Sequence, residues 1–158
     1  MRFVFILILL LTLKACNKEK DCVEYESNSG LIERTIEMGK CYSYLSGSPY
    51  FIKDTIAYQK LPDDAIDSIQ QLIGCSGNPA RPEIDFNKHA LLGVRTFAKG
   101  CIVSYDRFVK KDSINQQLLY KVDVHSCGNC NEQRYNMNWV LIPCTPDYNV
   151  LVSEVTYH

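Results

Sequence analysis

The sequence lacks the motifs that mark the commonest active sites. It contains no Gly-x-Ser-x-Gly elbow, no His-Glu-x-x-His zinc motif and no phosphate-binding loop. His89 and His158 have no catalytic partner at a characteristic spacing. Positive charge is not in excess either, since 17 Lys and Arg accompany 18 Asp and Glu, so the basic footprint of a nucleic-acid-binding protein is missing. We therefore expect a protein that is not an enzyme, holds no cofactor or metal, and does not bind nucleic acid.

No apolar run is long enough to cross a bilayer as a helix. The longest lies at residues 3–13 and consists of apolar residues and one Thr. Crossing a hydrocarbon core of roughly 30 Å takes about 20 residues. Because Arg2 precedes the run and charged residues follow soon after it, the segment is typical of a signal peptide.

The end of this segment resembles the lipobox of bacterial lipoproteins. Leu13, Ala15 and Cys16 match its pattern, whereas Lys14 stands where a small uncharged residue is usual. We predict that residues 1–15 are removed and that Cys16 is lipidated. The alternative is an ordinary signal peptide that is cleaved near Ala15.

A lipidated Cys16 determines where the protein resides. Acyl chains contribute about 0.8 kcal/mol per buried CH₂ group, so they hold a protein on a membrane. We predict an outer-membrane lipoprotein of the bacterial cell envelope, either periplasmic or surface-exposed. Residues 16–30 are polar and charged, which predicts a flexible tether. Residues 31–158 then form one β-rich domain.

Lipidation of Cys16 leaves seven of the eight cysteines in a compartment where disulfides persist. The hairpin predicted below brings Cys101 close to Cys130, which favours a bridge between them. The other cysteine assignments have weaker support, because a sequence alone does not determine disulfide connectivity. They are Cys127–Cys144, Cys41–Cys75 and an unpaired Cys22.

The Cys127-Gly-Asn-Cys130 motif has the spacing of a redox or metal-binding pair. A thiol-disulfide oxidoreductase needs such a pair at the start of a helix, and no convincing helix follows here. His125 and Cys144 could complete four zinc ligands with the pair, but structural zinc sites usually combine two such motifs. Structural disulfides are the simpler interpretation, and these two alternatives stay open.

The remaining pattern predicts an α+β fold dominated by antiparallel strands, as a small sandwich or an open barrel. Residues 118–125 alternate strictly between apolar and polar, as in a strand with one wet face. We expect a hairpin with residues 101–109 across a loop at 110–117. Further strands are predicted within residues 31–45 and at 50–53, 90–97, 138–143 and 150–155.

One or two short helices complete this prediction. Asp54 can cap a helical turn that runs to Leu61. Pro62, followed by acidic residues, predicts the start of a second helix that ends at Cys75.

The strand at residues 138–143 contains the single tryptophan, Trp139, within an unbroken apolar run. Such a run is typical of a strand buried on both faces. Trp139 is therefore expected to anchor the core. The alternative is a recognition residue on a binding surface.

Several short runs, taken in order, resemble a known family. They are residues 50–54, 82–88 (Pro-Glu-Ile-Asp-Phe-Asn-Lys), 91–93 (Leu-Leu-Gly) and 137–143 (Met-Asn-Trp-Val-Leu-Ile-Pro). The chain from about residue 50 to 155 resembles the small PrcB-like lipoproteins of Bacteroidetes. The resemblance implies a small β-rich domain without catalytic residues. It also implies an accessory role beside a surface protein complex, and hence a protein partner.

Overall fold

The computed structural model describes residues 22–39, 42–43, 45, 48–65 and 81–158. Within them lie eight strands and one helix. The elements are β1 (Glu26–Gly30), β2 (Arg34–Thr35), β3 (Tyr50–Ile52), α2 (Thr55–Ala65), β4 (His89–Lys99), β5 (Ile102–Asp112), β6 (Gln117–Cys127), β7 (Gln133–Pro143) and β8 (Val150–Tyr157).

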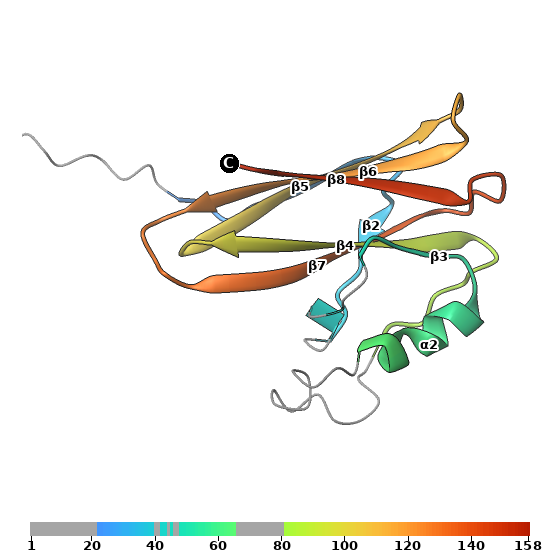
Figure 1. Cartoon of the computed structure of the whole chain (residues 1–158), viewed down its shortest axis with the longest axis horizontal. Helices are drawn as coiled ribbons and strands as arrows, with labels where there is room; N and C mark the ends of the chain where they lie inside the picture. The colour runs from blue at the N-terminus through green and yellow to red at the C-terminus, as the bar shows by residue number, and fades with distance from the viewer. Residues whose placement is uncertain (1–21, 40–41, 44, 46–47, 66–80) are drawn as a thin grey trace, which may run out of the picture.

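The strands form two four-stranded sheets that pack as a sandwich (Figure 1). The first sheet has the order β1-β5-β6-β8, and the second has the order β2-β7-β4-β3. Strand β1 runs parallel to β5 and β8 runs parallel to β6, whereas every other pair is antiparallel. The predicted α+β class with mainly antiparallel strands is confirmed, and the architecture is a sandwich that does not close into a barrel.

The β5–β6 hairpin follows the predicted alternation. On β6, Leu118, Tyr120, Val122 and Val124 are buried between the sheets, and their neighbours are partly exposed. The predicted loop was too long, because residues 110–112 and 117 belong to the strands. The tight turn forms because Asp112 Oδ1 accepts the backbone N–H groups of residues 114 and 115 at 3.1 and 3.2 Å. These bonds satisfy backbone N–H groups of the turn, so the hydrogen-bonded ladder between β5 and β6 extends further than the turn propensity of these residues indicates.

Strand β7 is buried on both faces from Met137 to Ile142, as its apolar run predicted. Val140 and Ile142 face the first sheet and join the core between the sheets. Trp139 and Leu141 face the other way, into a second core that they form with Tyr58 and Leu61 of helix α2. Figure 1 shows α2 on the side of the second sheet that faces away from the first sheet. This part of the second sheet is therefore the middle layer of three, which explains why residues 137–142 of β7 carry no wet face, whereas Gln133 and Tyr135 at its other end are exposed.

Helix α2 begins where Asp54 predicted and continues further than expected. Asp54 Oδ1 accepts the backbone N–H of Ala57 at 2.8 Å, which confirms the cap. The expected helix start at Pro62 is wrong, because α2 already runs through Pro62. Proline cannot donate to the Tyr58 carbonyl four residues earlier. That carbonyl accepts from the Arg81 guanidinium instead, so the proline is tolerated. Residues 66–80 lie outside the described part.

The predicted tether is wrong in its second half. Residues 26–30 form β1, which pairs in parallel with β5 from Tyr105 to Val109. Its side chains are exposed, so hydrophobic patterning could not reveal it. The edge of β5 supplies backbone partners regardless of side chain, and a disulfide at Cys22 holds the segment nearby. The folded domain therefore begins no later than Cys22. Of the two strands expected within residues 31–45, the described part contains one, β2.

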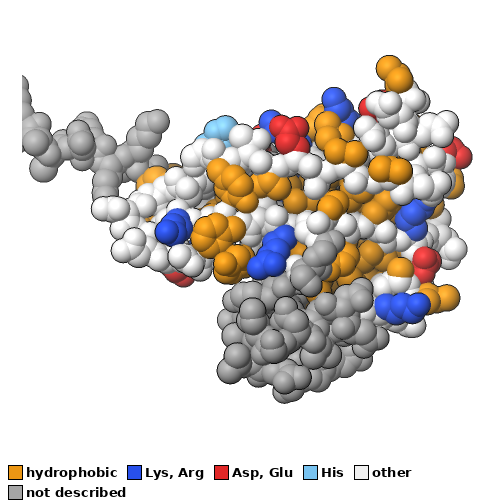
Figure 2. Space-filling model, viewed as in Figure 1, with side chains coloured by type: hydrophobic (Ala, Val, Ile, Leu, Met, Phe, Trp, Pro, Cys, Tyr) orange, Lys and Arg blue, Asp and Glu red, His pale blue; other side chains and the backbone are white. Residues whose placement is uncertain are grey.

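The surface combines apolar and charged side chains. Figure 2 shows apolar groups (orange) over the strands with Lys and Arg among them. Phe97 and Tyr135 form a cross-strand pair with ring centroids 5.0 Å apart, and Arg95 lies over the Tyr135 ring.

No helix in the described residues is long and apolar enough to span a membrane.

Candidate functional site

A partly enclosed cavity surrounds a free edge of β7. On the side away from β4, β7 pairs with β2 only at Val140 and Leu141. One more backbone bond, from Ile36 N–H to the Trp139 carbonyl at 2.9 Å, ends this contact. Within the described ranges, no strand pairs with this side of β7 from residue 133 to 138. The edge is open where β2 leaves it.

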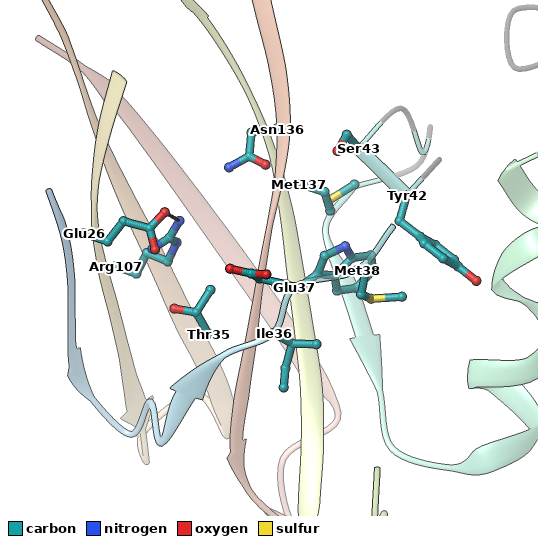
Figure 3. A pocket seen from close by; sticks show the side chains of 11 residues that line it. Glu26, Thr35, Ile36, Glu37, Met38, Tyr42, Ser43, Arg107, Asn136 and Met137 are labelled. Carbon is teal, nitrogen blue, oxygen red and sulfur yellow. Dashed lines mark hydrogen bonds and ion pairs between the residues drawn. The ribbon is translucent and has the colours of Figure 1, made fainter. Parts of the chain in front are cut away.

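A cavity of about 310 Å³ lies around this edge (Figure 3). Glu26 and Arg107 lie on one side of β7, Met38 and Tyr42 lie on the other, and Glu37 lies between them. The cavity therefore reaches both faces of the second sheet. Its lining is completed by Thr35, Ile36, Ser43, Asn136, Met137 and Trp139.

A second cavity, of about 420 Å³, continues the first one. The two share Glu26 and Asn136, and the second extends past Tyr105 to Glu132 and Arg134. Together they follow the open side of the sandwich between β1 and the N-terminal half of β7. We call the two cavities the edge groove.

Arg107 forms the charged floor of the edge groove. It projects from β5 into the space between the sheets, and only 2% of the residue is exposed. Its Nη1 and Nη2 atoms donate to the two carboxylate oxygens of Glu26 at 3.2 and 3.3 Å. The guanidinium also lies over the Tyr105 ring, 5.0 Å from its centroid. A buried cation is costly unless it is paired and hydrogen-bonded, and this geometry meets both conditions.

Asn138 connects Arg107 to both sheets. Its Oδ1 accepts from Arg107 Nε at 2.9 Å, and its Nδ2 donates to Thr96 Oγ1 at 3.0 Å. Its backbone carbonyl accepts the Tyr120 hydroxyl at 3.0 Å. Burial raises the pKa of Tyr120, so the hydroxyl stays protonated and donates. A fully bonded polar network of this kind joins the two sheets in one arrangement.

Sequence reasoning overlooked Arg107 and Asn138, although a sign of Arg107 was present. Val103, Tyr105 and Val109 share its strand face at a period of two, so a charge there interrupts an apolar stripe. A charged residue on a core face requires a partner. No sequence rule identifies Glu26 as that partner, because the two residues are 81 positions apart.

Trp139 lies in the core, as predicted, with 2% of the residue exposed. Its ring lies over Gly93 on β4, where a Cβ atom would approach three ring carbons to less than 3.0 Å. The indole nevertheless also lines the cavity. Its Nε1–H has no hydrogen-bond partner among the described residues. The core and recognition interpretations of Trp139 are therefore compatible.

The edge groove carries net negative charge. Four carboxylates line it (Glu24, Glu26, Glu37 and Glu132) together with two guanidinium groups (Arg107 and Arg134). The guanidinium groups pair with Glu26 and Glu132, the second pair at 3.0 Å. Glu24 and Glu37 form no ion pair with a described residue. Glu24 still attracts Arg134 through space, so among the described residues Glu37 is the groove carboxylate without a cationic partner.

Among the described residues, four cysteines are linked in two disulfides. Cys101 is joined to Cys130 with a Cα–Cα distance of 4.9 Å, the pairing that the hairpin favoured. Cys127 is joined to Cys22 with a Cα–Cα distance of 5.9 Å. The expected Cys127–Cys144 bridge and the expected unpaired Cys22 are therefore wrong.

The physical reason for this correction lies in β1. Its pairing with β5 brings the N-terminal segment to the end of the hairpin, where Cys127 lies. Cys144 follows the C-terminal end of β7, whereas Cys127 and Cys130 precede the N-terminal end of that strand. Cys144 is free and exposed. Cys16, Cys41 and Cys75 lie outside the described residues.

The two disulfides also bear on the alternatives for the Cys127–Cys130 motif. Each cysteine is bonded to a distant partner, so no disulfide joins the two. A zinc site would need their thiolates, together with His125 and Cys144. Among the described residues, no group of three or more His, Cys, Asp or Glu could hold a metal ion.

The histidines do have partners in space. His89 lies 2.9 Å from Glu33, and His125 lies 3.0 Å from Asp106. The rings of His125 and His158 stack with centroids 4.7 Å apart. All of these side chains are at least partly exposed, and none of them lines the edge groove.

No protein-family model matches the chain, and no curated protein or solved structure is significantly similar to it.

Proposed function

We propose that this protein is a membrane-anchored binding module of the bacterial cell envelope, which assists a protein complex without catalysing a reaction. The observation that carries the proposal is the edge groove. A groove of this kind, with a rigid charged floor and an open strand edge, is suited to hold a partner. The Arg107–Asn138 network fixes its geometry in advance, and this reduces the entropy lost on binding.

The proposed location rests on the N-terminus and on the cysteines. Residues 1–15 carry the features of a lipoprotein signal, and Cys16 is the residue that would receive the lipid. Two disulfides in a domain of this size agree with an oxidising compartment. The resemblance to PrcB-like lipoproteins supports the same role.

Lipidation is tested by expressing the full chain in a lipoprotein-competent bacterium with labelled palmitate. We expect label and membrane fractionation for the native chain, and loss of both for Cys16→Ser. A Cys16→Ser chain that keeps both would contradict the anchor.

The binding role is tested in the same cells with a photocrosslinking amino acid. It is placed at residue 37 in the edge groove or at residue 154 on β8, an exposed glutamate at the far edge of the first sheet. A discrete crosslinked protein band from position 37 alone is expected. Equal crosslinking from both positions would contradict a binding role for the groove.

A further inference from the structure

Three incomplete interactions meet at one place in the edge groove. They are the free backbone edge of β7 at Met137, the indole N–H of Trp139 and the carboxylate of Glu37. We propose that the groove binds an extended Lys- or Arg-bearing segment of a partner protein, which adds a strand to the second sheet beside Met137. This inference rests on the proposed binding function and specifies the chemistry of the partner.

The backbone of Met137 faces the open side. The Trp139 carbonyl points toward β2, since it accepts the Ile36 N–H at 2.9 Å. Backbone groups two residues apart on a strand point the same way, so the N–H and C=O of Met137 also point away from β4. In the described part of the chain no strand occupies that position. An added segment would continue the line of β2 along β7, which is the usual geometry of strand addition.

The Trp139 indole requires an acceptor. A buried N–H without a partner is rare and costs free energy, because the group has lost its water. Trp139 lines the cavity but its Nε1 atom is itself buried, so the groove must open slightly at this point for a bound acceptor to reach the Nε1–H. The backbone carbonyl groups of a peptide can accept this hydrogen bond. A simple ammonium compound without a carbonyl group has no atom that can accept it.

The charge of the groove selects a basic segment. Glu37 forms no ion pair with a described cation, whereas Glu26 is paired with Arg107 and Glu24 lies within the field of Arg134. Successive side chains of a strand point to opposite faces. Since the cavity opens on both faces of β7, one basic side chain can approach Glu37 while the next residue packs toward Met38 and the Trp139 ring.

A second copy of this chain is a poorer occupant. Pairing two β7 edges would bring two negatively charged grooves together, and like charges at an interface disfavour association. A segment of alternating basic and apolar residues fits both the charge and the two-sided shape.

The test measures peptide binding to the purified full-length lipoprotein in detergent by fluorescence anisotropy. The probe is a fluorescein-labelled peptide of alternating Val and Lys, about eight residues long, enough to follow the edge at about 3.3 Å per residue. The matched peptide of alternating Val and Glu reports the charge requirement. Two further Val-Lys peptides carry N-methyl groups on alternate residues, in the two opposite phases.

We expect saturable binding of the Val-Lys peptide and none of the Val-Glu peptide. One N-methylated phase should weaken binding at least tenfold and the other should not, because only alternate N–H groups point toward β7. Glu37→Gln should weaken binding about two- to fivefold, as for an exposed ion pair. Glu154→Gln on β8 makes the same charge change outside the groove and should leave binding unchanged.

Trp139→Phe keeps an aromatic ring in the core and removes only the N–H donor. It should weaken binding about two- to tenfold, the range for one hydrogen bond. If this variant fails to fold, the two N-methylated phases and Glu37→Gln still decide the matter.

Three results would overturn the inference. Equal binding of both N-methylated phases would show attraction by charge alone. Equal binding of the Val-Glu peptide would remove the basic requirement. Self-association that Glu37→Gln strengthens would assign the groove to a second copy. If labelling of Cys16 and crosslinking from position 37 hold while the Val-Lys peptide fails, only this inference falls.

Discussion

The ion pair between Arg107 and Glu26 offers a quantitative test of how the open side of the sandwich is stabilised. The Arg107 side chain is 1% exposed, whereas that of Glu26 is 51% exposed. Removing one partner of a fully buried pair costs about 3–5 kcal/mol, because a charge stays buried without compensation. Water in the groove can hydrate part of the guanidinium, so we expect about 1–3 kcal/mol for Glu26→Gln.

The reverse substitution, Arg107→Met, removes the buried charge itself. An apolar side chain of similar length at such a site is often neutral, but Asn138 Oδ1 would lose its donor at 2.9 Å and keep only the longer bond from Asn136 Nδ2 at 3.5 Å. One unsatisfied buried acceptor costs about 1–3 kcal/mol. In the double variant the residue at position 26 no longer faces a cation. The double variant should therefore be less destabilised than the sum of the two single variants, by about 1–2 kcal/mol.

The measurement is urea unfolding of the full chain under non-reducing conditions, followed by circular dichroism. Equal slopes with denaturant among the variants are needed for the comparison of free energies. Glu132→Gln is the matched control, because its partner Arg134 is a surface residue and little change is expected. Additivity of the two substitutions within about 0.5 kcal/mol would refute the argument that Arg107 depends on Glu26.

Four further outcomes are expected. Trp139→Ala should lower the free energy of unfolding by about 3–5 kcal/mol. Gly93→Ala should lower it by about 1–3 kcal/mol, because the added methyl group would collide with the indole. Thermal unfolding measures both, and an unchanged midpoint in either variant would contradict the packing of Trp139 on Gly93. Replacing Cys101 and Cys130 by Ser opens a loop of 29 residues and should cost about 3–4 kcal/mol in the chain-entropy model, whereas peptide mapping that recovers Cys130 joined to another cysteine would refute the pairing. Hydrogen bonds from the Asn115 side chain and backbone hold the pKa of Asp112 below its ordinary value of 3.8, so the turn should lose stability as the pH falls through the lowered pKa. Asp112→Asn should remove this pH dependence from acid unfolding curves. An unchanged dependence would assign it to other carboxyl groups.

Local patterns determined much of the fold. The alternation on β6 and the apolar run of β7 predicted both strands and the burial of Trp139, because side-chain periodicity follows directly from strand geometry. Asp54 predicted the start of α2, because a cap acts within three residues. The hairpin likewise placed Cys101 near Cys130, since both lie next to strands that are adjacent along the chain.

The sequence could not determine the interactions between segments that are distant along the chain. Strand β1 has exposed side chains and is held by the backbone edge of β5, so its own residues carry no hydrophobic pattern. That pairing in turn decides that Cys127 bonds to Cys22.

The edge groove has the same origin. Its walls come from β1, β5, β7 and the segment after β2, so its residues share no motif along the chain. Composition and local pattern determined the class of fold and much of the core of this protein, because those depend on neighbours within a few residues. Only the tertiary structure decided which charges meet and which strand edge stays open, because both depend on how remote strands pack.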